Sequence, residues 1–187
     1  MANPQQPFHE EIAQAVRGCW ALVAGRREAP SYFDFSRRGL VGSLIAVLLA
    51  MALAGFGPVL LGLPVQPGTA TQSVLVNAVL FAAQAGMGFL VLRQMGRQDG
   101  FVPYLVASNW VTLVSAVLLL VSTLFGALGL FMLAAVAIFA LVTFVNIGRF
   151  VVTLSPLQIG LLFVSQAVGV FLALGVIALL LPAPMPL

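Results

Sequence analysis

Five long runs of apolar residues follow one another along this chain, and charged residues stand only outside them or at their ends. The runs cover residues 39–61, 70–92, 103–125, 128–149 and 156–181. A helix needs about 20 apolar residues to cross the ~30 Å hydrocarbon core of a bilayer. The pattern therefore predicts five membrane-spanning helices in residues 39–187, preceded by an N-terminal region in residues 1–38.

Two boundaries between the predicted helices depend on local signals. Residues 101–147 carry no charge, and a single helix of that length would measure ~70 Å, about twice a bilayer. The segment FGALG at residues 125–129 is therefore predicted to form a turn. Before the fifth run, Ser155, Pro156 and Gln158 supply an N-cap serine, a proline at the first helical position and a capping-box glutamine, which predict a helix start.

The N-terminal region contains one amphipathic segment, residues 8–23. Glu10, Gln14 and Arg17 share one face at helical spacing, together with Ala21. This segment is too short and too charged to cross a bilayer, so we expect it to lie along the cytoplasmic membrane interface. The opposite, apolar face consists of Phe8, Ile12, Ala15, Val16, Cys19, Leu22 and Val23.

Composition indicates the same class of protein. The chain is 61% hydrophobic and 7% charged, with a mean hydropathy of +1.13, whereas about 25% of the residues in soluble domains are charged. We therefore predict an all-α integral membrane protein, a bundle of five spanning helices preceded by an interfacial amphipathic helix. The net charge of +3 does not indicate nucleic-acid binding, because the arginines lie at the ends of apolar runs and form no compact basic face.

The charges also predict an orientation in the membrane. If every run crosses once, all eight arginines and all five carboxylates lie on one side, and cationic segments are retained in the cytoplasm. The N-terminus is then cytoplasmic and the C-terminus external. Abundant Ala, Gly and Leu without lysine is typical of a GC-rich bacterial genome, which predicts the inner membrane and a periplasmic C-terminus. The bilayer and its anionic lipids are expected to contact Trp20, Arg37, Arg38, Arg93, Arg97, Asn146 and Arg149.

Amides are the most polar groups inside the predicted spans, where no Asp, Glu, Lys, Arg or His lies at depth. That absence disfavours proton-coupled transporters and ion pumps, which need a charged or titratable group there. Gln84 and Gln166 lie ~13 Å and ~15 Å from the arginine-bearing ends of their spans, near the midplane. They could form a Gln–Gln hydrogen bond worth ~1 kcal/mol or less, or line a polar substrate site. Asn77 and Asn109 are expected to make further polar contacts within the membrane.

Hydroxyl groups form a stripe along the third span, at Ser108, Thr112, Ser115 and Ser122. Such a stripe can line a water-filled path. It can also consist of hydroxyls that bond carbonyl groups of their own helix or a neighbouring helix.

Small residues recur every four positions on three of the predicted spans. Such rows let helix backbones approach closely, so the first, second and fifth spans are expected to form the packed centre. The same rows could dock a helix of a partner protein. They are Gly42, Ala46, Ala50 and Ala54; Ala78, Ala82 and Gly86; and Ser165, Gly169 and Ala173.

No group of residues in the sequence indicates catalysis. There is no nucleophile beside a histidine, no carboxylate pair in a span, no metal-ligand spacing and no phosphate-binding loop. The lone Cys19 excludes an intrachain disulfide, and Glu10 and Glu11 fit a solvated helix face. We therefore predict a protein that is not an enzyme and has no cofactor or metal.

Two local segments resemble the Yip family of small five-span membrane proteins. They are FDFSRR at residues 33–38, which leads into the first span, and RFVVTLSP at residues 149–156, which links the last two. The resemblance implies a cytoplasmic N-terminal region before five closely spaced helices. Eukaryotic members of that family act in vesicle trafficking through small GTPases, and bacterial relatives are described as membrane or transporter-like proteins.

Two functional hypotheses follow. The first is a non-enzymatic accessory or scaffolding subunit of a membrane complex, which binds another membrane protein or further copies of itself through helix packing. The alternative is a small permease or channel for a neutral or apolar solute, which uses Gln84, Gln166 and the hydroxyl stripe.

Overall fold

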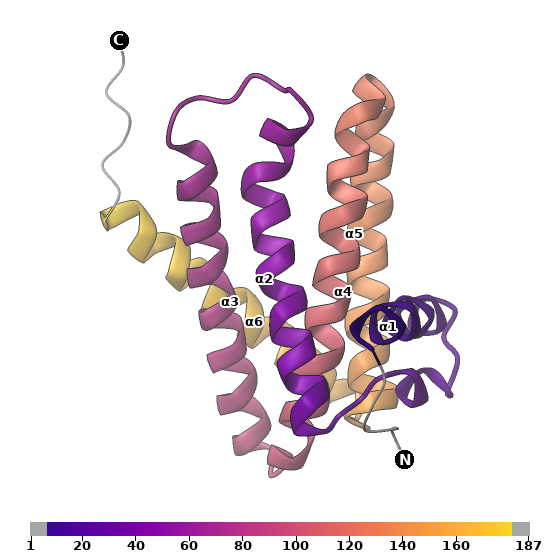
Figure 1. Ribbon diagram of the computed structural model, residues 1–187. Coiled ribbons are helices and arrows are strands. Elements are labelled where there is room, and N and C mark those ends of the chain that lie inside the picture. The colour runs from indigo at the N-terminus through magenta and orange to yellow at the C-terminus, as the bar shows by residue number, and fades with distance from the viewer. Residues whose placement is uncertain (1–6, 181–187) are drawn as a thin grey trace.

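The computed structural model describes residues 7–180, and within that range it contains helices and no strand. Five helices are long and apolar enough to cross a membrane, which confirms the predicted fold class (Figure 1). Their bounds differ from the predicted ones by three residues at most, and the predicted external tail at residues 181–187 lies outside the described residues. The helices are α1 (Phe8–Val23), α2 (Arg37–Leu60), α3 (Thr69–Gln94), α4 (Phe101–Ser122), α5 (Gly129–Asn146) and α6 (Pro156–Leu180).

Four short helical turns connect these helices. They are η1 (Ala29–Tyr32), η2 (Gln98–Gly100), η3 (Thr123–Leu128) and the π-helical η4 (Ile147–Val151). The predicted turn between the third and fourth spans is confirmed, since Gly126 in η3 has a φ of 52°. The capping box before α6 is also confirmed: the Ser155 N–H donates to Oε1 of Gln158 at 2.9 Å, and the Gln158 N–H donates to Oγ of Ser155 at 3.3 Å.

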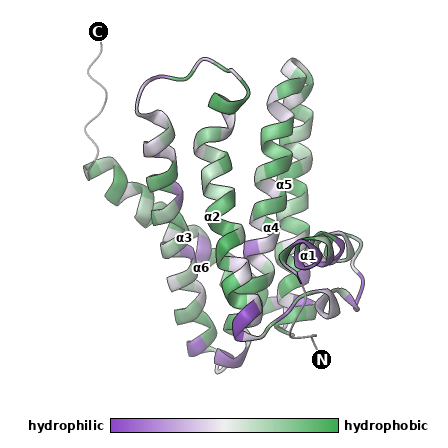
Figure 2. Ribbon diagram, viewed as in Figure 1, coloured by the Kyte–Doolittle hydropathy of each residue, from purple (hydrophilic) through white to green (hydrophobic). Residues whose placement is uncertain are grey.

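The spanning helices alternate in direction, and α6 crosses the others obliquely (Figure 1). We call the end at which α2 begins and α3 and α5 end the arginine end, because Arg37, Arg93 and Arg149 lie there. Figure 2 shows hydrophilic residues gathered at this end and around α1.

The packed centre of the bundle differs from the prediction. The most extensive interface joins α2 to α4, and α6 packs mainly on α3. The expectation is right for α2 and wrong for α3 and α6, few of whose residues are buried. A row of small residues on one helix permits close approach but does not specify which helix covers it.

Helix α1 folds against α4 and α5 near the arginine end (Figure 1). Its buried residues are Ala15, Gly18, Cys19, Ala21 and Leu22. Three of them belong to the predicted apolar face, and Gly18 and Ala21 shift the covered stripe to one side of it. Val16 is 48% exposed and Trp20 is 69% exposed. The shift accompanies the packing of α1 on η1, where a Cβ on Gly18 would lie 3.0 Å from Cβ of Tyr32.

A buried hydrogen bond joins the two central helices. The Asn109 side chain of α4 donates from Nδ2 to Oγ of Ser43 on α2 at 3.1 Å, and both residues are almost fully buried. The Ser43 hydroxyl in turn donates to the Leu40 carbonyl at 2.9 Å. Asn109 thus makes the expected polar contact inside the bundle. Its partner Ser43 could not be predicted, because nothing in the sequence distinguishes this serine from the others.

We expect Ser43→Ala to destabilise the bundle by about 1–3 kcal/mol, because it leaves a buried Asn109 amide without its acceptor. In an Asn109→Leu background the same change should cost less than about 0.5 kcal/mol, since the donor is gone. Unfolding in mixed detergent micelles measures both values. Thr112→Val is the control, because the Thr112 hydroxyl bonds only its own helix. Equal costs of Ser43→Ala in the two backgrounds would contradict the assigned bond.

Candidate functional site

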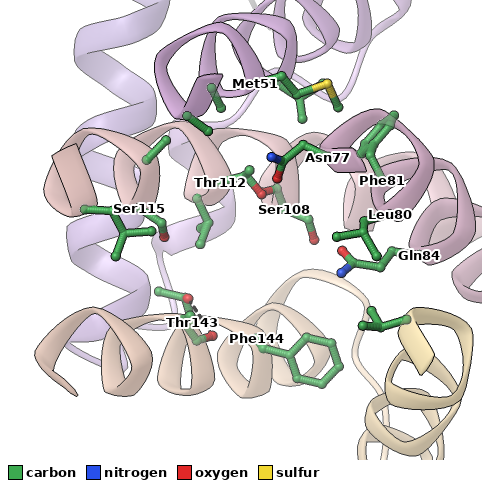
Figure 3. Close-up of a pocket in the computed structure, with 18 of the residues that line it drawn as sticks. Met51, Asn77, Leu80, Phe81, Gln84, Ser108, Thr112, Ser115, Thr143 and Phe144 are labelled. Carbon is green, nitrogen blue, oxygen red and sulfur yellow. Dashed lines mark hydrogen bonds between the residues drawn. The ribbon is translucent and has the colours of Figure 1, made fainter. Parts of the chain in front are cut away.

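A cleft of about 1020 Å³ lies between the spanning helices and is lined by residues of α2, α3, α4, α5 and α6 (Figure 3). The α5 and α6 sides meet at Phe144 and Phe163, whose rings pack edge to face with centroids 5.7 Å apart. Its walls are mainly apolar, and no charged residue lines it. The polar side chains that line it are Asn77, Gln84, Tyr104, Ser108, Thr112, Ser115, Thr123, Thr143 and Gln166.

The two glutamines meet, but through a different bond from the expected one. Nε2 of Gln166 donates to the main-chain carbonyl of Gln84 at 2.9 Å, so the two side-chain amides do not pair. Both residues line the cleft, and the side-chain amide of Gln84 has no hydrogen bond to any described residue. The structure therefore joins α6 to α3 through Gln166 and leaves the Gln84 amide available to a molecule in the cleft.

Asn77 and the hydroxyl stripe contribute further polar groups to the same space. Asn77 is held by its own helix, since Nδ2 donates to the Ser73 carbonyl at 2.8 Å. Figure 3 shows Asn77 and Gln84 pointing from α3 toward the Ser108 and Thr112 side of α4. The Thr112 hydroxyl donates to the Ser108 carbonyl at 2.9 Å, so its proton is engaged while its oxygen can still accept a hydrogen bond. The interpretation as hydroxyls bonded to their own helix is thus confirmed for Thr112, whereas a water-filled path along the stripe stays a prediction.

The stripe does not extend along the whole of α4. Ser122 is buried, does not line the cleft and donates to the Leu119 carbonyl at 2.6 Å. On α5, the Thr143 hydroxyl lines the cleft and donates to the Phe139 carbonyl at 2.7 Å. Sequence analysis missed Thr143, because a single threonine in an apolar helix is an ordinary residue.

The small residues of α2 have three different environments. Ala46 and Ala50 are buried as expected, whereas Ala54 is exposed and lines the cleft. A Cβ on Gly42 would lie 2.2 Å from Oε1 of Glu11, so Gly42 admits a carboxylate of α1 and not a spanning helix.

On α6, Gly169 and Ala173 are buried, and the half-buried Ser165 donates its hydroxyl to the Leu162 carbonyl at 2.7 Å. A Cβ on Gly169 would lie 2.6 Å from Cγ of Met87, which shows how closely α6 approaches α3 there.

The predicted packing row of α3 is not the face that this helix uses. Ala82 and Gly86 are exposed, Ala78 is half-buried, and a Cβ on Gly86 would meet nothing within 4 Å. The side of α3 that faces Gly169 of α6 carries Ala83 and Met87, each one position further along the chain. The expectation for Ala82 and Gly86 is wrong within this chain, because α3 is rich in small residues on more than one face.

Two residues assigned to the membrane interface instead hold protein segments together. Arg97 donates to the main-chain carbonyl groups of Val152 and Thr153 and, at 2.8 Å, to Oγ1 of Thr153, whose φ is +58°. Nδ2 of Asn146 donates to the Leu22 carbonyl at 2.7 Å and so attaches the end of α1 to α5. Trp20, Arg37, Arg38, Arg93 and Arg149 are exposed.

Glu11 does not lie on a solvated face. Its Oε1 atom is buried against Gly42 and has no hydrogen-bond partner among the described residues. Burial raises the pKa of this carboxyl, the neighbouring Asp34 raises it further, and Arg38 lowers it. The expectation for Glu11 was therefore wrong, because contact with α2 is a long-range event that the amphipathic pattern of α1 does not record.

The raised pKa of Glu11 predicts a pH dependence. The folded state binds the proton more tightly than the unfolded state, so the packing of α1 should weaken as the pH rises from the ordinary glutamate pKa to the raised one. We expect Glu11→Gln to increase the hydrogen-exchange protection of α1 at neutral pH by roughly threefold, a modest change because Glu11 is only partly buried. The exposed Glu10→Gln is the matched control, and equal effects of both changes would contradict the prediction.

The remaining titratable groups of the described segment offer no assembled reaction centre. Cys19 is buried, and burial raises its pKa to about 12, so its thiol is a poor nucleophile at neutral pH. Within residues 7–180, no group of three His, Cys, Asp or Glu residues could hold a metal ion.

Comparison with known proteins adds no assignment: no protein-family model, curated protein or solved structure matches the chain. The resemblance to the Yip family stays a prediction.

Proposed function

We propose that this membrane protein binds a neutral, mainly apolar molecule in its intramembrane cleft and lets it cross or enter the bundle, as a small permease does. The single observation that carries the proposal is the cleft of about 1020 Å³, which has apolar walls and a few convergent amides and hydroxyls. Binding sites for small molecules typically have this composition and volumes of about 300–1,000 Å³. The cleft thus favours the second of the two hypotheses drawn from the sequence.

The absence of charge in the cleft defines the class of ligand. An ionised group brought into an apolar, membrane-embedded space pays a large desolvation cost unless a counter-charge receives it, and no lining residue provides one. A neutral hydroxyl or carbonyl group of a ligand can instead bond the Gln84 amide or the Thr112 oxygen. We therefore propose a long-chain alcohol or similarly neutral amphiphile, moved passively.

Photolabelling in lipid nanodiscs tests this proposal. The probes are a photoreactive hexadecanol and the matching photoreactive fatty acid, which is ionised at neutral pH. The proposal expects the alcohol to label cleft residues of α4 and α5, with competition by unlabelled hexadecanol and much weaker labelling by the acid. Labelling spread over the outward faces, without competition, would reject it.

The proposed location is a bacterial inner membrane with the arginine end on the cytoplasmic side. This orientation rests on the retention of cationic segments in the cytoplasm. Accessibility of a single cysteine introduced at Arg17 or at Gln66, in a Cys19→Ala background, tests it from the two sides.

A second function, that of an accessory subunit, is favoured by the exposed small residues of α3. Ala82 and Gly86 face away from the rest of the chain and leave room for a close helix contact. Native mass spectrometry after gentle extraction should then show a stoichiometric protein partner that Gly86→Leu removes. Gly160→Leu on α6 is the control, because that position is also open.

A further inference from the structure

A second, shallower pocket of about 370 Å³ lies at the arginine end and is lined by Arg27, Arg149, Phe150 and Thr153. Arg27 belongs to the segment after α1, whereas the other three belong to η4 and the residues beyond it. The two segments are brought together by packing of η1 against η4. Two arginines from distant parts of the chain therefore line one small pocket.

The framework of this pocket is held by specific bonds. Asn146 attaches the end of α1 beside η4 through the Leu22 carbonyl. On the other side, Arg97 bonds the carbonyl and hydroxyl groups of Thr153 and so fixes a residue with left-handed backbone geometry. Arg149 lies over the Phe150 ring, with its guanidinium carbon 5.2 Å from the ring centroid. These contacts restrict where the pocket residues can lie before any ligand binds.

The charge balance of the pocket is positive. None of its lining residues is a carboxylate. Glu28, the neighbour of Arg27 in the chain, lies 3.7 Å from Arg26, and Asp99 lies 3.7 Å from Arg97, so both carboxylates pair with arginines that do not line the pocket. An anion bound in a pocket that both arginines line is attracted by two positive charges. Planar guanidinium groups match the oxygens of phosphate in pairs, which makes arginine the preferred residue for such anions.

We propose that Arg27 and Arg149 form a binding site for a phosphate monoester group, with the Thr153 hydroxyl as a third polar contact. The phosphate can belong to the headgroup of a membrane lipid such as phosphatidic acid or to a soluble phosphate. This site is separate from the intramembrane cleft, and it does not depend on the function proposed for that cleft.

Lipid retention measured by native mass spectrometry tests the site on the full chain. Protein is released from nanodiscs of phosphatidylcholine that contain either phosphatidic acid or phosphatidylglycerol, whose phosphate is a diester. We expect phosphatidic acid to be retained preferentially, and Arg27→Gln or Arg149→Gln to reduce that retention by about tenfold. Arg149→Lys, which keeps the charge but loses the planar fork, should retain part of the preference.

Arg17→Gln is the matched control, because Arg17 is an exposed arginine on α1 that does not line the pocket. Competition by inorganic phosphate at millimolar concentration, with loss of that competition in Arg27→Gln, would support the site and assign it to soluble phosphate. Equal losses in Arg17→Gln and Arg27→Gln, or no preference for either lipid together with no phosphate competition, would overturn the proposal.

Discussion

Replacing Gly39 by alanine should destabilise the bundle by about 1–3 kcal/mol, because a β-carbon has no room at the start of α2. A Cβ at this position would lie 1.8 Å from the main-chain oxygen of Asp34. This oxygen belongs to the backbone, and two hydrogen bonds hold that backbone in place. The Ser36 N–H donates to Oδ1 of Asp34 at 2.9 Å, and the Gly39 N–H donates to Oγ of Ser36 at 3.4 Å. The chain that enters α2 would have to move as a unit. Unfolding in mixed micelles measures the loss.

The matched control for this prediction is Gly160→Ala on α6. That glycine is exposed and a Cβ there would meet nothing within 4 Å, so alanine should be neutral or slightly stabilising through its better helix propensity. A Gly39→Ala protein as stable as Gly160→Ala would show that the entry segment is free to move.

The span positions could be predicted because hydropathy is a property of consecutive residues. A run of about 20 apolar side chains commits a segment to the membrane whatever its neighbours do. The helix start is likewise a local signal, because Ser155 and Gln158 lie within four consecutive residues, and the turn depends on a single glycine, Gly126. These features require no knowledge of which helix lies beside which.

The contacts between helices could not be predicted as well, because each contact depends on two segments that lie far apart in the sequence. Ala82 and Gly86 form a row as regular as any in the chain, yet α6 packs beside Ala83 and Met87. When a helix carries alanine or glycine on several faces, the shape of the neighbouring helix determines which face is packed. The bond from Arg97 to Thr153 and the burial of Glu11 have the same origin, because each depends on segments far apart in the chain.

Some features of the candidate site could be predicted from the sequence, and others could not. Gln84, Gln166 and most of the hydroxyl stripe were identified from depth and spacing, and they do line one cleft. The cleft itself could not be foreseen, because residues of five helices line it and their relative placement, including the oblique course of α6 (Figure 1), is set by packing. Hydropathy gives a helix its depth in a bilayer but leaves its tilt to packing.

A bulky side chain that fills the cleft should abolish ligand binding without unfolding the protein. Ala140 of α5 lines the cleft and is exposed, so Ala140→Trp can occupy the space without displacing a packed neighbour. We expect competed labelling by the photoreactive hexadecanol to fall by at least about tenfold, equivalent to ~1.4 kcal/mol of binding free energy. The stability of the variant should stay close to that of the parent, since no buried group is lost.

Ala135→Trp provides the decisive comparison for the cleft. Ala135 lies on the same helix and is also exposed, but it does not line the cleft. Both variants add the same apolar surface to α5, so a general effect on membrane insertion or lipid contact would change both equally. A loss of labelling in Ala140→Trp alone means that the molecule binds inside the bundle. An equal loss, or none in either variant, means that the probe reports only the lipid-facing surface, and the bundle must then act through its outer faces, where Ala82 and Gly86 are the available contacts.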